Sequence, residues 1–331
     1  MKTLLVALSV VFAVGCSAAA PDDASEGTTE DDLTVAPPLG PSPSGKPTRY
    51  PIVLAHGLFS AASGPVGFHA EIEKALVRDG HRVFRAASVP PVASVEVRAK
   101  ALAADVDAVL RRTGAAKVNI VAHSMGGLDA RALGAGLGYG DRVASVTTIV
   151  SPHRGSKIAD VALGMGEGHG DALDGLLRLM PPPSGTERDD VSLRAALTDL
   201  SVARSEAFNR AHPNDPRVYY QSWAGVSRFA GLPWPEARAA CEGRFLSFRS
   251  RVDQLDASLA GVAPFVGTAV NDGMVTVESS KWGNFRGCVP ADHSDQVGSL
   301  AFAFTLYSAW TGFDAVRFNR NIAFDLAARG F

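Results

Sequence analysis

The sequence predicts an α/β protein whose mostly parallel, doubly wound sheet carries helices on both faces. Between residues 50 and 150, short apolar runs alternate with longer segments whose apolar residues recur at helical spacing. An apolar run such as Ile52-Val53-Leu54-Ala55 is typical of a strand that is buried on both of its faces. Strands that alternate with helices favour a parallel sheet. With 331 residues, of which 46% are hydrophobic, the chain can bury a sizeable core.

The individual elements follow from local patterns. The segment 94–113, for example, has one apolar stripe at helical spacing and stops at Gly114, a residue that is common just after a helix. The same reasoning, applied along the chain, gives the other elements. Strands are expected at 50–55, 82–86, 117–122 and 143–150, and further helices at 68–79 and 126–137.

Residues 1–15 are predicted to be an export signal of the lipoprotein type. Lys2 precedes an apolar run from Leu4 to Val14, which is too short to span a membrane as a mature helix. The run ends in Ala13-Val14-Gly15-Cys16, which resembles the site where bacterial lipoproteins are lipidated on the cysteine. An ordinary secretory signal cleaved nearby is the alternative. Either hypothesis exports the protein, as an outer-membrane-anchored lipoprotein or as a secreted, extracellular protein.

A flexible tether is expected over residues 16–48, followed by one domain over 49–331. The tether is acidic at first and then rich in Pro, Ser and Gly, with almost no large apolar side chains to bury. Within the domain, a lid or cap is expected over about 163–215. One short amphipathic helix in it is either a mobile lid or a packed surface helix. Its apolar positions are Leu173, Leu176, Leu177 and Met180.

Charge and cysteine content limit the classes of function. The net charge is −2 and 20% of the residues are charged, so the composition offers no basic surface for nucleic acid. The chain has three cysteines. If Cys16 is lipidated or removed, Cys241 and Cys288 remain as a pair in an oxidising compartment. They form a disulfide or stay as free buried thiols.

A nucleophilic serine is predicted at Ser124, in Ala122-His123-Ser124-Met125-Gly126-Gly127. This segment joins an apolar strand to a helix and matches the nucleophile elbow, with alanine in the first small position. Small residues on both sides of the serine let the strand and the helix approach closely. The hydroxyl then stands exposed on a tight turn, where it meets both substrate and base. A serine that serves only the turn is the alternative.

Oxyanion donors are expected at two backbone positions near this serine. Gly57 allows a close turn after the first strand, so that the N–H of Leu58 can point at a tetrahedral oxygen beside the N–H of Met125. His56 is expected to be a structural hydrogen-bond partner. His123 is an unsuitable base because it is adjacent to the nucleophile along the strand.

The acid and the base should follow the serine in the order Asp or Glu, then His. Of the eight histidines, four lie downstream: His153, His169, His212 and His293. His293 lies in a loop before the last helix, whereas the other three are in local, flexible or exposed settings. Asp272 ends an apolar segment and can accept the Nδ1–H of His293. Asp272 as a simple residue of an Asn-Asp-Gly turn is the alternative.

Four segments together resemble the true bacterial triacylglycerol lipases of the Pseudomonas/Burkholderia type, within the α/β-hydrolase superfamily. The likeness covers nearly everything after Arg49 and is weakest between 164 and 190. It implies an α/β-hydrolase fold with Ser124, Asp272 and His293 as the catalytic triad and with Leu58 and Met125 as oxyanion donors. The segments are Tyr50-Pro51-Ile52-Val53-Leu54-Ala55-His56-Gly57, the elbow, Ser151-Pro152-His153-Arg154-Gly155-Ser156 and Asn271-Asp272-Gly273-Met274-Val275.

The resemblance also implies a structural calcium ion close to the catalytic histidine. Asp253 and Asp295 stand where the family places its two carboxylate ligands, and the backbone carbonyls of Ser299 and Ala303 would complete the site. Two solvated surface aspartates are the alternative. The chain departs from the family at Glu278, because the family has a disulfide cysteine in that neighbourhood. A bridge between Cys241 and Cys288 would therefore be a different staple.

These observations predict an exported serine ester hydrolase, with triacylglycerol lipase as the favoured activity. A short-chain carboxylesterase or a polyester depolymerase is the alternative within the enzymes. A non-catalytic surface lipoprotein on the same fold is the alternative outside them. Calcium is the expected cofactor, with no organic cofactor. The expected partners are a lipid or ester substrate and, through lipidated Cys16, a membrane. A dedicated folding chaperone is a further partner that the sequence leaves open.

Overall fold

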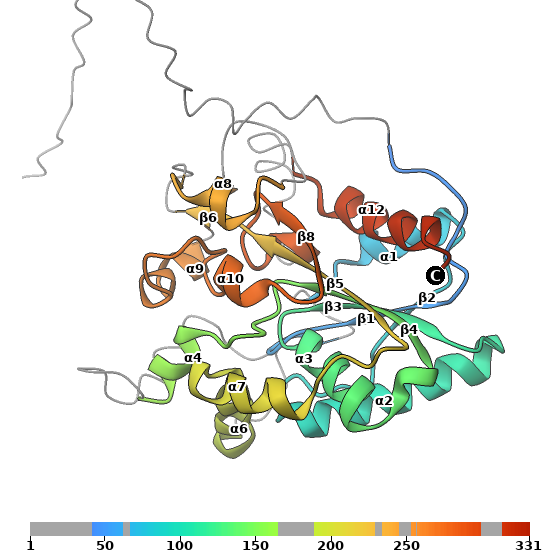
Figure 1. Cartoon of the computed structure of the whole chain (residues 1–331), viewed down its shortest axis with the longest axis horizontal. Helices are drawn as coiled ribbons and strands as arrows, with labels where there is room; N and C mark the ends of the chain where they lie inside the picture. The colour runs from blue at the N-terminus through green and yellow to red at the C-terminus, as the bar shows by residue number, and fades with distance from the viewer. Residues whose placement is uncertain are drawn as a thin grey trace, which may run out of the picture.

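A six-stranded parallel sheet organises the protein (Figure 1). The computed structural model describes residues 42–61, 67–164, 189–228, 234–244, 253–255, 257–298 and 313–331. The strand order is β2-β1-β3-β4-β5-β8, so β2 lies on one side of β1 and the later strands are added on its other side. All five strand pairs are parallel. The predicted parallel α/β fold is therefore confirmed. The strands are β1 (Ile52–Ala55), β2 (Val83–Arg85), β3 (Val118–His123), β4 (Val143–Ile149), β5 (Tyr219–Gly225) and β8 (Asn284–Val289).

Helices cover both faces of the sheet and divide the core into layers (Figure 1). Helices α1 (Ala70–Arg78) and α12 (Ala315–Ala328) lie on one face, and α2 (Val95–Thr113) and α3 (Gly126–Arg131) lie on the other. Because successive side chains of a strand point to opposite faces, β1 contributes to both layers. Leu54 packs in the α1/α12 layer, and Val53 packs in the α2/α3 layer.

The structure confirms the predicted ends of helix α2, whereas the helix predicted over 126–137 is divided into two elements. Ser94 caps α2 by accepting from the N–H of Val97, and Gly114 ends it with a φ of 63°, which glycine adopts at little cost. The single helix expected over 126–137 instead becomes α3 and a π-helical turn, η2 (Ala132–Gly136). In that turn the N–H of Leu137 donates to the carbonyl of Ala132, five residues earlier.

Two strands of the sheet, β5 and β8, were not expected from the sequence. Strand β5 carries polar side chains at buried positions, and one of them forms a hydrogen bond with a side chain of the neighbouring strand β4. Gln221 donates its amide to the Thr147 hydroxyl at 2.9 Å. Strand β8 lies at the edge of the sheet and includes Arg286 and the irregular pairing around Gly287. Neither pattern resembles a continuous apolar run, so the periodicity that finds central strands misses both.

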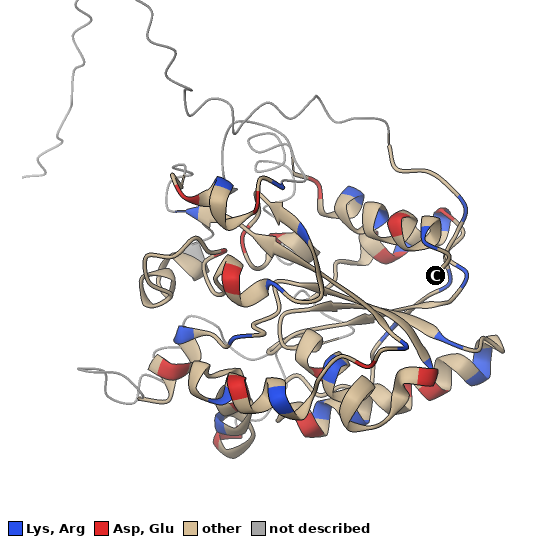
Figure 2. Cartoon of the chain, in the orientation of Figure 1, with Lys and Arg blue, Asp and Glu red and all other residues tan. Residues whose placement is uncertain are grey.

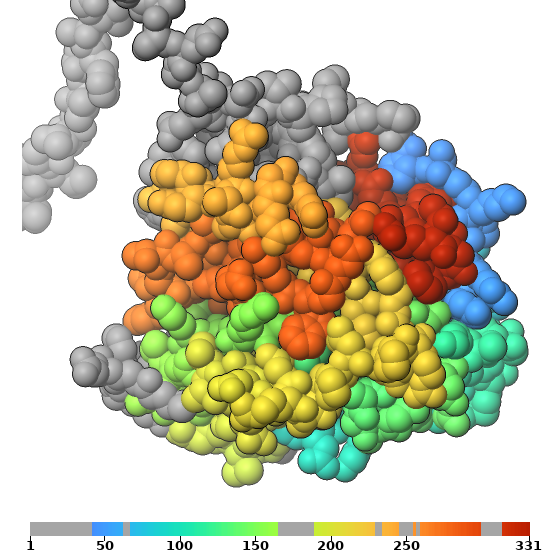
Figure 3. Space-filling view, viewed as in Figure 1, coloured from blue at the N-terminus to red at the C-terminus, as the bar shows by residue number. Residues whose placement is uncertain are grey.

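A helical cap lies beside the carboxyl ends of the strands. Helices α4 (Lys157–Ala162), α6 (Asp190–Leu200) and α7 (Val202–Ala211) pack on one another there. The helix expected around Leu173 lies outside the described residues. The remaining elements are η3 (Tyr139–Asp141), β6 (Ser227–Arg228), α8 (Ala237–Ala240), β7 (Asp253–Gln254), α9 (Ala257–Ala260), η5 (Ala263–Phe265), α10 (Val277–Ser280) and η6 (Asp295–Val297). In the space-filling view, the green and yellow residues of the cap lie below the orange segment that carries α9 and α10 (Figure 3).

Basic and acidic residues alternate along the outer helices (Figure 2). This mixture agrees with the small net charge of −2. Among the helices that the structure describes, none combines the length and the apolar character needed to cross a membrane.

The two ends of the domain meet. The N–H of Arg49 donates to the carbonyl of Phe331 at 2.7 Å. Ordered contacts begin before Arg49, because Arg320 bonds to the Ser42 hydroxyl and Thr48 is buried against His81. The signal segment, Cys16 and the tether up to residue 41 lie outside the described residues.

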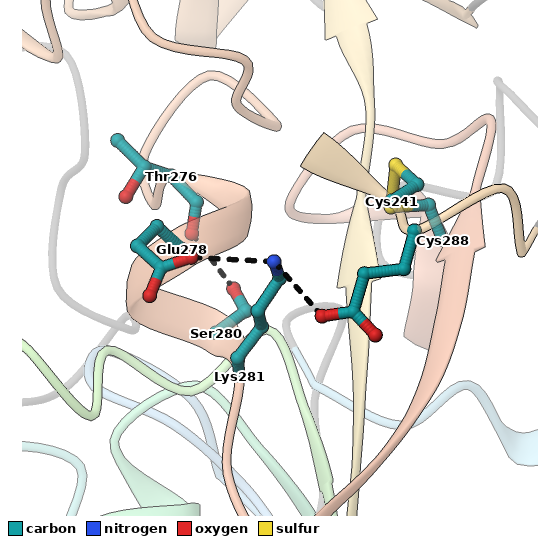
Figure 4. Close-up of a disulfide and its surroundings, with 7 residues drawn as sticks. Cys241, Thr276, Glu278, Ser280, Lys281 and Cys288 are labelled. Carbon is teal, nitrogen blue, oxygen red and sulfur yellow. Dashed lines mark hydrogen bonds and ion pairs between the residues drawn. A yellow bond between two sulfur atoms is a disulfide. The ribbon is translucent and has the colours of Figure 1, made fainter. Parts of the chain in front are cut away.

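A disulfide joins Cys241, which ends α8, to Cys288 in strand β8 (Figure 4). This confirms the expected pairing and excludes free thiols. The two cysteines are 47 positions apart, and closing a loop of that length is worth about 4 kcal/mol in the chain-entropy model. Beside the bridge, Lys281 contacts Glu278 at 3.3 Å and Glu242 at 3.2 Å. In the family that the sequence resembles, a cysteine lies near position 278. Here Glu278 instead belongs to an ion-pair cluster beside the Cys241–Cys288 disulfide.

Candidate active site

Ser124 occupies a strained turn between β3 and α3. Its φ is 53°, a left-handed value that residues other than glycine seldom adopt. Two glycines make the turn possible. A Cβ at Gly126 would lie 2.7 Å from the carbonyl oxygens of Ala55 and His56, and one at Gly127 would lie 2.0 Å from the Ser151 hydroxyl. The small residues of the elbow are therefore required by the close approach of α3 to the neighbouring strands.

The structure brings Ser124, His293 and Asp272 together in one hydrogen-bonded chain. The Nε2 of His293 lies 2.9 Å from the Oγ of Ser124, and its Nδ1 lies 2.8 Å from the Oδ2 of Asp272. His293 is 6% exposed and Asp272 is fully buried. With Nδ1–H donating to the carboxylate, Nε2 can accept the proton of the serine hydroxyl. This arrangement can activate the serine as a nucleophile.

Asp272 reaches this position from a turn instead of from the end of a strand. The only pairing around it is an isolated bridge between Asn271 and Thr276 in the described residues. Its Oδ1 accepts from the N–H groups of Met274, at 3.0 Å, and Val275, at 2.7 Å. Asp272 therefore stabilises a turn, as the alternative interpretation proposed, and also makes the expected contact with His293. One carboxylate oxygen holds the turn and the other contacts the imidazole.

The expected oxyanion positions lie in the two segments that adjoin the serine. A Cβ at Gly57 would be 2.7 Å from the Cβ of Ser124, which shows how closely the chain after β1 passes the elbow. Phe59 follows with a φ of 58°, so the chain turns sharply there. Met125 stands at the N-terminal end of α3. The backbones of Leu58 and Met125 therefore border the space next to the Ser124 hydroxyl.

A buried ion pair supports both of these backbone segments. Arg98, on α2, donates to the Oδ2 of Asp129 in α3 at 2.9 Å and to the carbonyl of His56 at 2.7 Å. It also binds the carbonyl of Pro90. Arg98 is fully buried and Asp129 nearly so. Burial raises the pKa of Asp129 to about 7, and the guanidinium opposes this shift by stabilising the carboxylate.

The sequence analysis missed this pair, although it contained a signal. Arg98 lies on the apolar stripe of its helix, between Val95 and Leu102, and a cation at such a position requires a buried partner. The partner itself could not be named, because Asp129 is 31 positions away.

An apolar pocket opens at the serine. Residues from the oxyanion loop, helix α4 and helix α6 line it together with Ser124 and His293. This composition suits an acyl chain or another apolar group next to the nucleophile. The apolar lining includes Leu58, Phe59, Pro152, Ile158, Ala159, Leu197, Leu200, Met274 and Val275.

Three further histidines make structural contacts. His56 contacts the carbonyl of Gly57, and burial lowers its pKa to about 4. His153 is buried against Thr148, and burial holds its pKa well below the usual value. His212 contacts the carbonyl of Phe208. His169 lies outside the described residues.

The expected calcium ligands can be placed only in part. Asp295 begins η6 directly after the His293 loop, and Asp253 begins β7. The side chain of Asp253, together with Ser299 and Ala303, lies outside what the structure describes. Among the described side chains, no group of three or more His, Cys, Asp or Glu could hold a metal ion. The calcium site therefore stays a prediction.

The sheet, its helical layers and the serine at a strand-to-helix turn define an α/β hydrolase. The family model described as alpha/beta hydrolase fold matches residues 50–247. Because this match covers more than half of the chain, the chain belongs to the α/β-hydrolase family.

Similar proteins narrow the class. The chain is 30% identical to a triacylglycerol lipase of Pseudomonas fragi over 284 residues, which cover 77% of this chain and 89% of that protein. It is 45% identical to a triacylglycerol lipase of Vibrio cholerae over 116 residues, or 34% of this chain and 36% of that protein. The chain thus spans only about a third of the latter relative. These matches group it with the triacylglycerol lipases, a class of carboxylic ester hydrolases.

Solved structures agree on the fold. The Staphylococcus hyicus lipase superposes with a TM-score of 0.55 at 18% identity, covering 86% of this chain and 97% of that one. The mature Bacillus licheniformis lipase BlEst2 gives a TM-score of 0.54 at 20% identity, covering 83% and 95%. At these identities the likeness concerns the fold alone.

The support that Arg98 gives to both oxyanion segments leads to a prediction. Arg98→Lys keeps the charge, but one ammonium cannot replace a fork that reaches Asp129 and the His56 carbonyl together. We expect ester turnover (kcat) to fall about tenfold, because displaced donors hold the oxyanion less well. Steady-state kinetics with a p-nitrophenyl ester measures this.

The control for this change is Arg320→Lys, which alters a second arginine–aspartate fork. This fork joins α12 to Asp79 at the end of α1, on the other face of the sheet from α2 and α3. It should leave kcat unchanged. Equal effects of the two substitutions on kcat would contradict the role of Arg98.

Proposed function

We propose that this chain is an exported serine ester hydrolase, a triacylglycerol lipase, in which Ser124, His293 and Asp272 act as the catalytic triad. The observation that carries the proposal is the hydrogen-bonded chain of these three side chains, 2.9 and 2.8 Å long at its two links, beside an apolar pocket. The lipase names of the relatives support the choice of substrate class.

Acylation begins at the serine hydroxyl. The Nε2 of His293 takes its proton while Oγ attacks the ester carbonyl, and the carbonyl π electrons move onto the oxygen. The N–H groups of Leu58 and Met125 donate to this oxyanion. When the tetrahedral intermediate collapses, the C–O bond to the alcohol breaks, and the alcohol oxygen takes the proton from His293. The products of this half-reaction are an acyl-enzyme on Ser124 and a free alcohol.

Deacylation repeats the sequence with water. His293 takes a proton from the water, whose oxygen attacks the acyl carbon, and the same two N–H groups stabilise the second oxyanion. Collapse breaks the bond to Ser124, which regains its proton from His293. The Asp272 carboxylate holds the Nδ1–H throughout and stabilises each imidazolium as it forms. The net reaction cleaves one ester with one water.

The proposal predicts that Ser124→Ala abolishes ester hydrolysis. We expect p-nitrophenyl ester turnover to fall by about 10⁴- to 10⁶-fold, because the nucleophile is lost, while the circular dichroism spectrum stays unchanged. Ser156→Ala, which removes another hydroxyl from the same pocket, is the matched control and should retain activity within a few-fold. Full activity of the Ser124 variant would refute the triad.

Two further measurements address the alternatives. A fluorophosphonate probe should label wild type and not Ser124→Ala, whereas a non-catalytic binding protein would not react. A chain-length profile from butyrate to palmitate, with soluble and emulsified esters, separates a lipase from a short-chain carboxylesterase. Preference for long, emulsified esters supports the lipase, and exclusive use of short, soluble esters favours the carboxylesterase.

We also propose a structural calcium ion held by Asp253 and Asp295, as the resemblance implies. The local connectivity fits. Strand β7 begins at Asp253 and pairs with Ser227, and the adjacent Val226 donates to the carbonyl of Val289, a few residues before Asp295. These backbone contacts link the segment of Asp253 to the strand that precedes the Asp295 loop. This link supports a site at which a hard cation neutralises both carboxylates.

Removal of calcium should lower stability. With the site saturated about 100-fold above its Kd, the ion would contribute about 2.7 kcal/mol, so we expect EDTA to lower Tm by about 5 °C. Added CaCl₂ should restore the Tm of wild type. In Asp295→Asn the chelator should have little further effect. An unchanged Tm of wild type in EDTA would contradict the proposal.

Export and anchoring are proposed from the first residues of the chain. The apolar run that ends at Cys16 supports lipidation of that cysteine. We expect labelled palmitate to enter wild type, and Cys16→Ser to lose the label and leave the membrane fraction. Absence of label in wild type, with the protein in the medium, would favour an ordinary secretory signal.

A further inference from the structure

His123, which immediately precedes the nucleophile, contacts the backbone of the proposed base. Its Nε2 lies 2.8 Å from the carbonyl oxygen of His293, and the two rings are 4.9 Å apart. His123 is the last residue of β3 and is 5% exposed, and its ring makes a T-shaped contact with the ring of Phe68. The residue before the nucleophile is therefore bonded to the residue that activates the nucleophile.

The partner fixes the proton on this ring. A carbonyl oxygen can only accept, so Nε2 of His123 must carry the hydrogen. Burial, together with the nearby rings of His293 and His56, lowers the pKa of His123 to about 3. The ring therefore stays neutral, with Nδ1 unprotonated. Nδ1 has no hydrogen-bond partner among the described residues. His123 is thus a permanent, neutral donor aimed at one acceptor.

This bond completes a clamp on the backbone of His293. The N–H of His293 donates to the carbonyl of Asp272 at 2.9 Å, and its C=O accepts from His123 at 2.8 Å. The N–H of His293 is thus bonded to Asp272, the proposed acid. Its C=O is bonded to the last residue of the strand that precedes the nucleophile. The base is therefore fixed relative to both of its partners by its backbone as well as by its side chain.

We propose that His123 is a positioning residue, whose Nε2–H bond to the His293 carbonyl sets the distance between the base and Ser124. This inference rests on the proposed function. His123 also borders the apolar pocket but is only 5% exposed. It follows that loss of the donor acts mainly by lowering the rate of proton transfer from Ser124. A displacement of about 1 Å in such a pair can cost up to about 100-fold in rate.

The test compares two amides of different reach. In His123→Gln the side-chain N–H₂ can extend to the position of Nε2, whereas the amide of His123→Asn is one methylene shorter and cannot. We expect kcat for a p-nitrophenyl ester to fall at least about tenfold in the Asn variant, with KM within about twofold of wild type. The Gln variant should recover most of that loss. Fluorophosphonate labelling rates should follow the same order.

A second buried histidine gives the matched control. His81 is 3% exposed and bonds to Thr48 at the opposite end of the sheet, before β1 and β2 begin. His81→Asn should lower Tm about as much as His123→Asn does, because each removes a buried ring, yet leave kcat unchanged. Melting curves of all variants separate stability from rate.

The outcomes distinguish the inference from the proposed function. If wild type neither hydrolyses esters nor reacts with the probe, the proposed function fails. If wild type is active and His123→Asn matches His81→Asn in kcat, the positioning role is overturned. Equal losses in the Gln and Asn variants would also overturn it, because the ring would then matter for packing and not for its hydrogen bond.

Discussion

The close approach of two chain segments, one after β1 and one after β3, is the constraint on which the site depends. Parallel pairing of these strands brings the 56–58 segment alongside the elbow. Only glycine fits at the contact, since a Cβ at position 57 or at position 126 would come within 2.7 Å of neighbouring atoms. The left-handed turn at Ser124 costs energy that the surrounding packing must supply. In return, the nucleophile and both expected oxyanion donors occupy one small region at the carboxyl ends of two central strands.

A polar framework lies behind this contact and complements the apolar layers. Arg98 connects the oxyanion segment to α3, and His123 connects the nucleophile strand to the loop of His293. Each uses a side-chain donor to hold a backbone carbonyl, which leaves less freedom than apolar packing would. Dispersion and burial hold the sheet to its helices, whereas these few directional bonds fix the orientation of backbone groups around the serine.

The features that could be predicted from the sequence are those that depend on residues close together in the chain. The elbow around Ser124, the central strands and the end of α2 at Gly114 depend on short-range patterns. The order of the triad along the chain then pointed to Asp272 and His293, and the family resemblance assigned the same two residues. Strands β5 and β8 were missed because their burial involves polar or edge positions. The partners of Arg98 and His123 were missed because they lie 31 and 170 positions away. Such contacts come from the tertiary fold, which no single-segment pattern contains.

The bond between Arg49 and Phe331 has a practical consequence for anyone who builds on this scaffold. Because the domain starts beside the place where it ends, a short linker could join the two ends and new termini could be opened at an exposed loop elsewhere. Such a circularly permuted chain would keep every strand pair of the sheet. A reporter attached at Phe331 would lie beside Arg49. The reporter and the segment that precedes Arg49 would therefore leave the domain on the same side.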